Sequence, residues 1–248
     1  MGMPNTKLII SYDGTDFFGW QRQKEHRSVQ QTLEEILERL SGGERVVCYA
    51  SGRTDTGVHA VGQVVHFHSK MTMPTDKLFL ALNGLLPKDI VVKSVERVPD
   101  EFHASFSAKR KLYRYVINDA RAPDVFLRRY AWHYPYSRLN DVAMNQAAQY
   151  LLGEHDFRCF ETNWPNRKTS VRTITYINVC RADQLLWVDV EANGFLYNMV
   201  RAITGTLVQV GRGYWTPEYV KEIVELGKRA EAGPTAPPEG LFLMRVTY

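Results

Sequence analysis

Residues 28–40, SVQQTLEEILERL, carry the strongest helical pattern in the chain. Apolar side chains recur there at the three- and four-residue spacing of one helix face. Ser28 stands three positions before Gln31, which is the form of a capping box, and Gly42 with Gly43 follows the last apolar residue. The pattern predicts a helix over these residues.

Runs of strand type flank this helix and complete the pattern of the first half of the chain. The predicted strands are Leu8–Tyr12, Arg45–Ala50, Gln63–His68 and Ile90–Val98, and a second helix opens at Thr75 and Asp76 and closes at Gly84 and Pro87. The order is then β-α-β-β-α-β for residues 1–107, the N-terminal half.

The second half, residues 108–248, is predicted to follow a similar plan. Its elements are a strand at Lys111–Ile117, a helix at Asn140–Leu152, a hairpin of Thr173–Arg181 with Leu185–Ala192, helices at Leu196–Val208 and from Thr216, and a last strand at Leu241–Tyr248. We therefore predict an α+β fold, with a mixed and largely antiparallel sheet in two related halves around a central cleft. Such a groove is a natural place for a site.

Length and composition limit the class of protein. The chain has 248 residues, of which 44% are hydrophobic and 23% charged, so it can bury a core and is neither disordered nor fibrous. It contains no run of about 18 apolar residues, so we expect no membrane span and a cytoplasmic protein. Cys48, Cys159 and Cys180 form no CxxC pair and are expected to be buried small hydrophobes. The net charge of +4 is too small to identify a polyanionic partner.

The loop Gly52–Ala60, GRTDTGVHA, holds the densest group of chemically active side chains. Arg53, Asp55 and His59 lie within seven residues between two predicted strands, and glycines permit tight backbone paths there. One interpretation is a functional loop, and the other is an ordinary turn in which Thr54 and Asp55 bond their own backbone. A phosphate-binding P-loop is disfavoured because no Gly-Lys-Ser/Thr follows.

A metal site could be proposed from His59, His66 and His68, because His66 and His68 share one face of a strand. No cysteine or second carboxylate of ligand spacing stands nearby in the sequence, so this alternative is disfavoured. We predict no metal ligands.

Cations alternate with aromatic residues in the segment Lys109–Tyr115, KRKLYRY. On a strand Lys111, Tyr113 and Tyr115 point one way, so basic groups could hold phosphates while a tyrosine ring supports a base. The alternative is an edge strand guarded by its charges. Further cations stand in irregular segments at Arg22, Lys24, Arg27, Arg128, Arg129, Arg167, Lys168 and Arg172. If they converge, they form a groove for a polyanion.

Arg201 lies in the apolar helix predicted at Leu196–Val208. A cation buried there needs a partner such as a carboxylate. The ordinary alternative is a surface arginine whose charged end reaches water.

Six ordered motifs run through almost the whole chain. They are Tyr12-Asp13-Gly14-Thr15 with Gly19-Trp20-Gln21; Gly52–Ala60 with Gly62-Gln63-Val64; Phe102-His103-Ala104 with Phe106-Ser107-Ala108; Lys111–Tyr115; Asn193-Gly194-Phe195-Leu196 with Met199-Val200-Arg201; and Ala236-Pro237 with Gly240-Leu241. In this order they resemble the tRNA pseudouridine synthase A family, whose members modify uridines at positions 38, 39 and 40 in the anticodon stem-loop of tRNA. One departure is Thr56, where the family commonly has alanine, and it affects the fine geometry of the loop beside Asp55.

The resemblance implies a role for each of five residues. Asp55 is the catalytic aspartate, Tyr113 packs on the target base, Arg201 pairs with Asp55, Leu241 lines the uracil pocket, and Arg53 helps to hold the flipped nucleotide. It also implies the pseudouridine synthase fold, tRNA as the partner, a homodimer, and a reaction that needs neither a metal nor an organic cofactor.

Isomerisation of uridine breaks the N1–C1′ bond, turns the base and joins C5 to C1′. One carboxylate can serve, whereas glycoside hydrolases pair two around an activated water, and the loop Gly52–Gly62 contains no second acid. Two alternatives stay open. An RNA-binding module without activity would have no use for Asp55, and an RNA nucleosidase would release free uracil.

Overall fold

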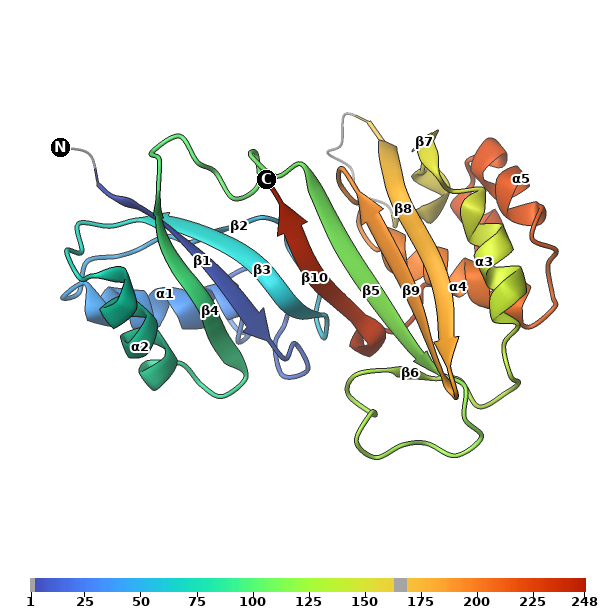
Figure 1. Ribbon diagram of the computed structural model, residues 1–248, viewed down its shortest axis with the longest axis horizontal. Coiled ribbons are helices and arrows are strands. Elements are labelled where there is room, and N and C mark those ends of the chain that lie inside the picture. Colours follow the sequence, from blue (N-terminus) through green and yellow to red (C-terminus); the bar gives the residue numbers. More distant parts are fainter. Residues whose placement is uncertain (1–2, 163–168) are drawn as a thin grey trace. The chain divides into compact units, whose positions relative to one another are not determined.

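The computed structural model describes residues 3–162 and 169–248, and the chain divides into two compact units (Figure 1). The first unit is Met1–Lys109 with Phe242–Tyr248, and the second is Arg110–Leu241. The C-terminal segment therefore groups with the first unit and not with the second half of the sequence, because its strand pairs with a strand of the first unit. That the two halves are related to each other stays a prediction.

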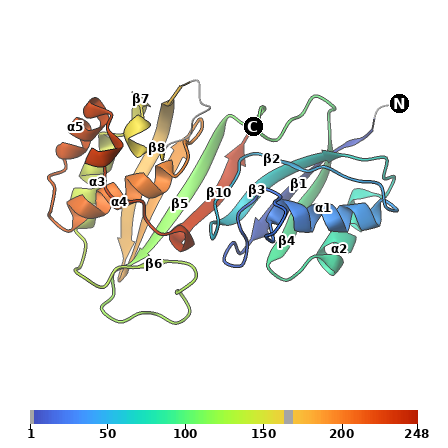
Figure 2. The same cartoon turned by 180° about the vertical axis from the view of Figure 1, so that it is seen from behind.

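The first unit is a sheet with two helices. Its strands are β1 (Asn5–Tyr12), β2 (Tyr49–Ala50), β3 (His59–His68), β4 (Ile90–Val98) and β10 (Leu241–Thr247), and its helices are α1 (Val29–Leu40) and α2 (Thr75–Leu85). Strand β1 runs antiparallel between β4 and β3, and β10 adds parallel to β3 with Phe242 opposite His59. Figure 2 shows α1 in front of β1 and β4. The predicted order β-α-β-β-α-β is confirmed.

Helix α1 forms where it is predicted, directly after Ser28. The Ser28 hydroxyl accepts a hydrogen bond from the backbone N–H of Gln31 at 3.3 Å, as an N-cap does. In place of the second half of a capping box, the Gln31 amide donates to Glu35 at 2.8 Å. The apolar face of the helix is buried and consists of Val29, Leu33, Ile36 and Leu37. This burial joins the helix to the core of the first unit.

The strand predicted at Arg45–Ala50 is wrong over most of its length, because only Tyr49–Ala50 forms β2. Side chains of helix α1 bind the backbone that a longer strand would use. Glu34 accepts from the N–H of Cys48 at 3.0 Å, and the Gln30 amide donates to the carbonyl of Cys48 at 3.1 Å. The segment before β2 is therefore bonded to a helix and not to a neighbouring strand.

The second unit also combines a sheet with helices. Its strands are β5 (Arg110–Asn118), β6 (Trp132–His133), β7 (Gly153–Asp156), β8 (Val171–Ala182) and β9 (Leu185–Ala192); its helices are α3 (Asp141–Gln149), α4 (Met199–Gly211) and α5 (Tyr219–Leu226), with 3-10 turns at Arg158–Phe160, Arg229–Glu231 and Pro238–Gly240. Strands β5, β9, β8 and β7 are antiparallel neighbours in that order, and β6 runs parallel to the end of β5. Helix α3 packs on β8 and on α4 (Figure 1). The α+β class with largely antiparallel strands is confirmed.

Two helices of the second unit have ends that differ from the predictions for local reasons. Helix α4 begins at Met199 and not at Leu196, because Asn198 has a left-handed backbone with φ of 62°, which stops the helix from extending back. Helix α3 ends at Gln149 and not at Leu152, because the next two N–H groups bond three residues back and tighten the last turn.

The cysteines follow their places in these elements. Cys48 and Cys159 are buried, as predicted, whereas Cys180 is exposed because it alternates with buried Val179 along β8. Within the described residues, every helix is too short or too polar to span a bilayer.

Candidate active site

The loop that carries Asp55 connects β2 to β3 in the first unit. Buried and open positions alternate along it: Ser51 and Thr54 are buried, Arg53 is exposed and Asp55 is partly exposed. Both side chains predicted to act on the substrate therefore reach solvent, as does Thr56, while Thr54 between them is packed inside. The Thr54 hydroxyl pairs with that of Tyr12, 2.8 Å away. That this loop is functional stays a prediction.

Two glycines bring the segment 14–20 into backbone contact with this loop. Gly19 has φ of 78°, and a Cβ placed there would stand 2.6 Å from the carbonyl oxygen of Thr54. The N–H of Trp20 donates to that same carbonyl at 3.0 Å. A Cβ at Gly14 would stand 2.0 Å from the carbonyl oxygen of Val58. The motifs around Gly14 and Gly19 are thus required by close packing against the Asp55 loop.

A tight turn follows Asp55 immediately. The N–H of Val58 donates to the carbonyl of Asp55 at 3.1 Å, and Gly57 has φ of 77°, which glycine adopts without strain. The N–H of Gly57 also donates to the carbonyl of Phe17 at 3.3 Å. The turn therefore holds the backbone on the C-terminal side of Asp55.

Of the three histidines weighed as metal ligands, His59 and His66 are buried in the first unit and His68 is exposed. The Nδ1 atom of His59 accepts from the N–H of Gly14 at 3.0 Å, and Nδ1 of His66 accepts from the N–H of Ala104 at 3.1 Å. Burial and the neighbouring histidines His103 and His68 lower the pKa of His66 to about 4. Within the part of the chain that the structure describes, no group of three or more His, Cys, Asp or Glu side chains could hold a metal ion.

The second unit holds Tyr113 in the middle of β5. Its side chain is only 8% exposed, and its ring lies edge-on to Phe195 with centroids 4.9 Å apart and planes at 81°. Phe195 comes from the Asn193–Leu196 motif, so this motif fixes the tilt of the Tyr113 ring. Sequence reasoning missed this support, although the motif itself was the available signal.

Arg201 lies in helix α4 of the second unit, and Leu241 is the last residue of that unit, where β10 begins. The Nε of Arg201 donates to the carbonyl of Ala236 at 2.7 Å, and Nη1 donates to the side-chain oxygen of Asn198 at 2.8 Å. Arg201 lies in the first turn of α4, and these two bonds fix the orientation of its guanidinium. Leu241 is buried at the start of β10, directly after the turn Pro238–Gly240. Asp55 belongs to the first unit and Arg201 to the second, and their pairing stays a prediction.

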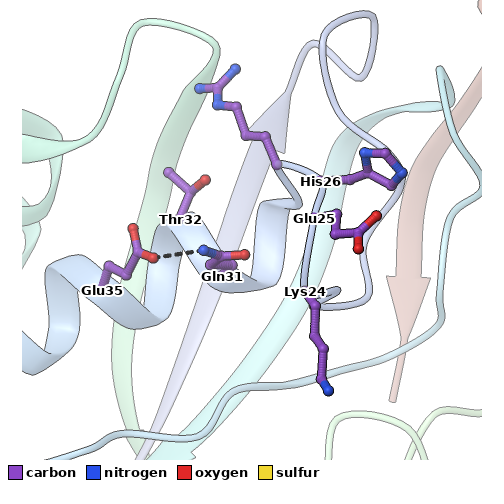
Figure 3. A pocket seen from close by; sticks show the side chains of 7 residues that line it. Lys24, Glu25, His26, Gln31, Thr32 and Glu35 are labelled. Carbon is purple, nitrogen blue, oxygen red and sulfur yellow. Dashed lines mark hydrogen bonds between the residues drawn. The ribbon is translucent and has the colours of Figure 1, made fainter.

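Two of the predicted cations at the start of helix α1 are engaged by carboxylates. Arg22 lies 3.0 Å from Glu34, and Arg27 binds both oxygens of Asp89 at 2.7 and 3.0 Å. The Arg27 guanidinium also stacks 4.0 Å from the centre of the Phe17 ring. A pocket here is lined by Lys24, Glu25, His26, Arg27, Gln31, Thr32 and Glu35 (Figure 3). Its charge is mixed, so these residues alone do not form a strongly basic surface.

Of the other predicted cations, Arg128 and Arg129 lie in a loop of the second unit, and Arg172 lies at the start of β8. A nitrogen of the Arg128 guanidinium donates to the carbonyl of Val125 at 2.7 Å, and Arg172 donates to the carbonyl of Thr169 at 3.2 Å. Arg167 and Lys168 lie outside the described residues. The convergence of these cations into one groove stays a prediction.

The sequence matches known proteins over nearly its full length. The family model described as tRNA pseudouridine synthase matches residues 8–107 and 147–248. The tRNA pseudouridine synthase A of Acetivibrio thermocellus is 45% identical over 246 residues, which cover 99% of this chain and 100% of that protein. The proteins of the same name from Anoxybacillus flavithermus and Bacillus licheniformis are each 46% identical, over 99% and 98% of this chain and equal shares of those proteins.

Among solved structures, the chain matches one in the crystal structure of the archaeal box H/ACA sRNP Nop10-Cbf5 complex. The match covers 82% of this chain and 43% of the other, at 12% identity and a TM-score of 0.33. A likeness of this size carries no argument about this protein. The family match and the relatives do support an assignment. The matches include residues of both units, and each of the six motifs lies within the length that the relatives cover. On these grounds the chain belongs to the tRNA pseudouridine synthase family.

Proposed function

We propose that this protein is a tRNA pseudouridine(38-40) synthase, which isomerises uridine to pseudouridine in the anticodon stem-loop. The observation that carries the proposal is the identity of 45% with a tRNA pseudouridine synthase A over 99% of the chain. The partly exposed Asp55, next to the buried Thr54 in its loop, supplies a carboxylate of the kind that the reaction requires.

Asp55 is the catalytic group in this proposal. The reaction breaks N1–C1′, turns the detached uracil and forms C5–C1′, after which the proton on C5 leaves and N1 takes up a proton. The carboxylate acts as nucleophile or as base, so it must be ionised. Arg201 serves as its partner, since a nearby cation favours the charged form and lowers the pKa of a carboxyl group.

The other site residues bind the substrate. Tyr113 packs on the target base, and its contact with Phe195 keeps the ring in one orientation. Arg53, exposed two residues before Asp55, holds the flipped nucleotide, and buried Leu241 lines the uracil pocket. Extrusion of a base from its stack costs a few kcal/mol, which these contacts offset.

The enzyme works as a homodimer in the cytoplasm, on tRNA. A folded tRNA is larger than one globule of this length, whose radius of gyration is about 18 Å by chain-length scaling. A second copy supplies contacts to phosphates far from the target base. As the family resemblance implies, the proposed reaction uses neither a metal nor an organic cofactor.

The test is to incubate the purified protein with unmodified tRNA and to map pseudouridine at each nucleotide. Pseudouridine confined to positions 38, 39 and 40 is the expected result. Release of free uracil would identify a nucleosidase, and tRNA that is bound but unchanged would identify a binding module.

A further inference from the structure

A buried hydrogen-bond network lies under the Asp55 loop, entirely within the first unit. The hydroxyls of Tyr12 and Thr54 are 2.8 Å apart. The Gln63 amide donates to the carbonyl of Gly52 at 2.8 Å and stands 3.5 Å from the Tyr12 hydroxyl. Ser51 donates to the Gln63 side-chain oxygen at 2.7 Å. Tyr12 ends β1 and Gln63 lies in β3, so two strands of the sheet anchor the network.

The network binds the residues that alternate with the proposed functional ones. Ser51, Gly52 and Thr54 are its attachment points in the loop, and Arg53 stands between Gly52 and Thr54. Thr54 directly precedes Asp55, and its carbonyl is also bound by the N–H of Trp20 at 3.0 Å. Both the hydroxyl and the carbonyl of Thr54 are therefore bonded. The residues on either side of it, Arg53 and Asp55, extend from a backbone that these bonds fix to the sheet.

The members of the network are buried, so they are shielded from exchange with water. Ser51 and Gln63 are fully buried, and Tyr12 and Thr54 nearly so. Burial raises the pKa of Tyr12 to about 12, so its hydroxyl keeps its proton at neutral pH and stays available as a donor. Loss of one hydroxyl would leave its partner buried without that bond, which favours rearrangement of the loop.

We propose that Tyr12, Gln63 and Thr54 are positioning residues for the isomerisation, which hold Arg53 and Asp55 in the geometry that the reaction needs. The inference rests on the proposed function of Asp55. It assigns no contact with the substrate to Tyr12, Gln63 or Thr54. Since a displacement of about 1 Å at a reacting group can cost about 100-fold in rate, loosening this network should slow chemistry far more than it weakens tRNA binding.

Tyr12→Phe and Thr54→Val test the network from its two ends, because each removes a hydroxyl and keeps the shape of the side chain. We expect the single-turnover rate at saturating tRNA to fall about 10- to 100-fold in each, with the Kd for tRNA unchanged within about twofold. The double variant should be no slower than the slower single variant, because both break the same bond. Thr54→Ser restores a hydroxyl and should recover the rate to within about threefold of the unaltered protein.

Tyr248→Phe is the matched control, because the Tyr248 hydroxyl donates to the carbonyl of Ala104 at 2.7 Å in the same unit. It should lose a comparable hydrogen bond, measured as a lower thermal midpoint, and keep its rate. Loss of less than about threefold in both Tyr12→Phe and Thr54→Val would overturn the inference. So would a Thr54→Ser variant as slow as Thr54→Val, or a fall in rate matched by an equal loss of tRNA binding.

The Asp55→Asn variant tests the proposed function of Asp55 separately from the positioning role. If Asp55→Asn is inactive while Tyr12→Phe and Thr54→Val are fully active, only the positioning role fails. If Asp55→Asn retains activity, the catalytic assignment fails, whatever the network variants do.

Discussion

The substitution Gly19→Ala probes the contact between the Asp55 loop and the segment before it. A Cβ at this position would lie 2.6 Å from the carbonyl oxygen of Thr54, 3.1 Å from the carbonyl carbon of Asp55 and 3.2 Å from the nitrogen of Thr56. All three atoms belong to the backbone on either side of the proposed catalytic carboxylate. The methyl group therefore pushes directly on the backbone of this loop.

The cost of this change has two parts. Gly19 has φ of 78°, and a non-glycine residue in this region costs about 1–3 kcal/mol. To regain even the 3.0 Å that real Cβ atoms keep, the loop or the glycine segment must also move by about 0.4 Å. Because about 1 Å of misplacement can cost about 100-fold, we expect the single-turnover rate to fall about tenfold at saturating tRNA.

Gly42→Ala separates these two parts. Gly42 has φ of 74°, close to that of Gly19, but a Cβ there meets no atom within 4 Å. Both variants should therefore lose stability in chemical denaturation, and Gly19→Ala should lose more. The single-turnover rate should fall only in Gly19→Ala. Equal rates in the two variants would refute the claim that this contact sets the geometry of the loop.

Four further outcomes follow from the proposed site and assembly. Tyr113→Leu should slow single turnover far more than Tyr113→Phe, because stacking on a base is worth about 1–3 kcal/mol and only Leu removes it; equal damage would assign the role to the hydroxyl. Arg201→Leu should raise the pKa of Asp55, so the acid limb of the pH–rate profile should move to higher pH, and an unmoved limb in an active variant would show that the two residues do not interact. The same change should cost about 1.5–3 kcal/mol per lost bond in unfolding free energy, because Arg201 also binds Ala236 and Asn198. Light scattering should show a dimer, and an active monomer at assay concentration would contradict the proposed assembly. In a binding assay, the affinity for tRNA should fall steeply as the salt concentration rises.

Local patterns in the sequence predict most elements of both units. Strand β4 occupies Ile90–Val98 as predicted, and α1 follows its N-cap Ser28, because period and capping are properties of neighbouring residues. The segment before β2 is not predictable in this way, since its backbone is bound by side chains of α1 that lie more than ten residues earlier. The left-handed Asn198 likewise overrides an apolar period that continues through it.

The site shows the same division. The motif resemblance predicts Asp55 and Tyr113 as site residues, and the loop containing Asp55 stands out from its composition alone. The reason for the glycine motifs becomes visible only when Gly19 is found against the Thr54 carbonyl. The support of Tyr113 by Phe195, 82 positions later in the chain, depends on the pairing of β5 with β9 and is equally hidden in a linear pattern.

The most direct test of the central claim is to map pseudouridine in unmodified tRNA after incubation with the unaltered protein and, in parallel, with Asp55→Asn. This change is nearly isosteric and removes the carboxylate's ability to act as nucleophile or base. Pseudouridine should form at positions 38, 39 and 40 with the unaltered protein and at none of them with Asp55→Asn, which should still bind tRNA. Activity of Asp55→Asn within about tenfold of the unaltered protein, a difference of less than about 1.4 kcal/mol in barrier, would contradict the account.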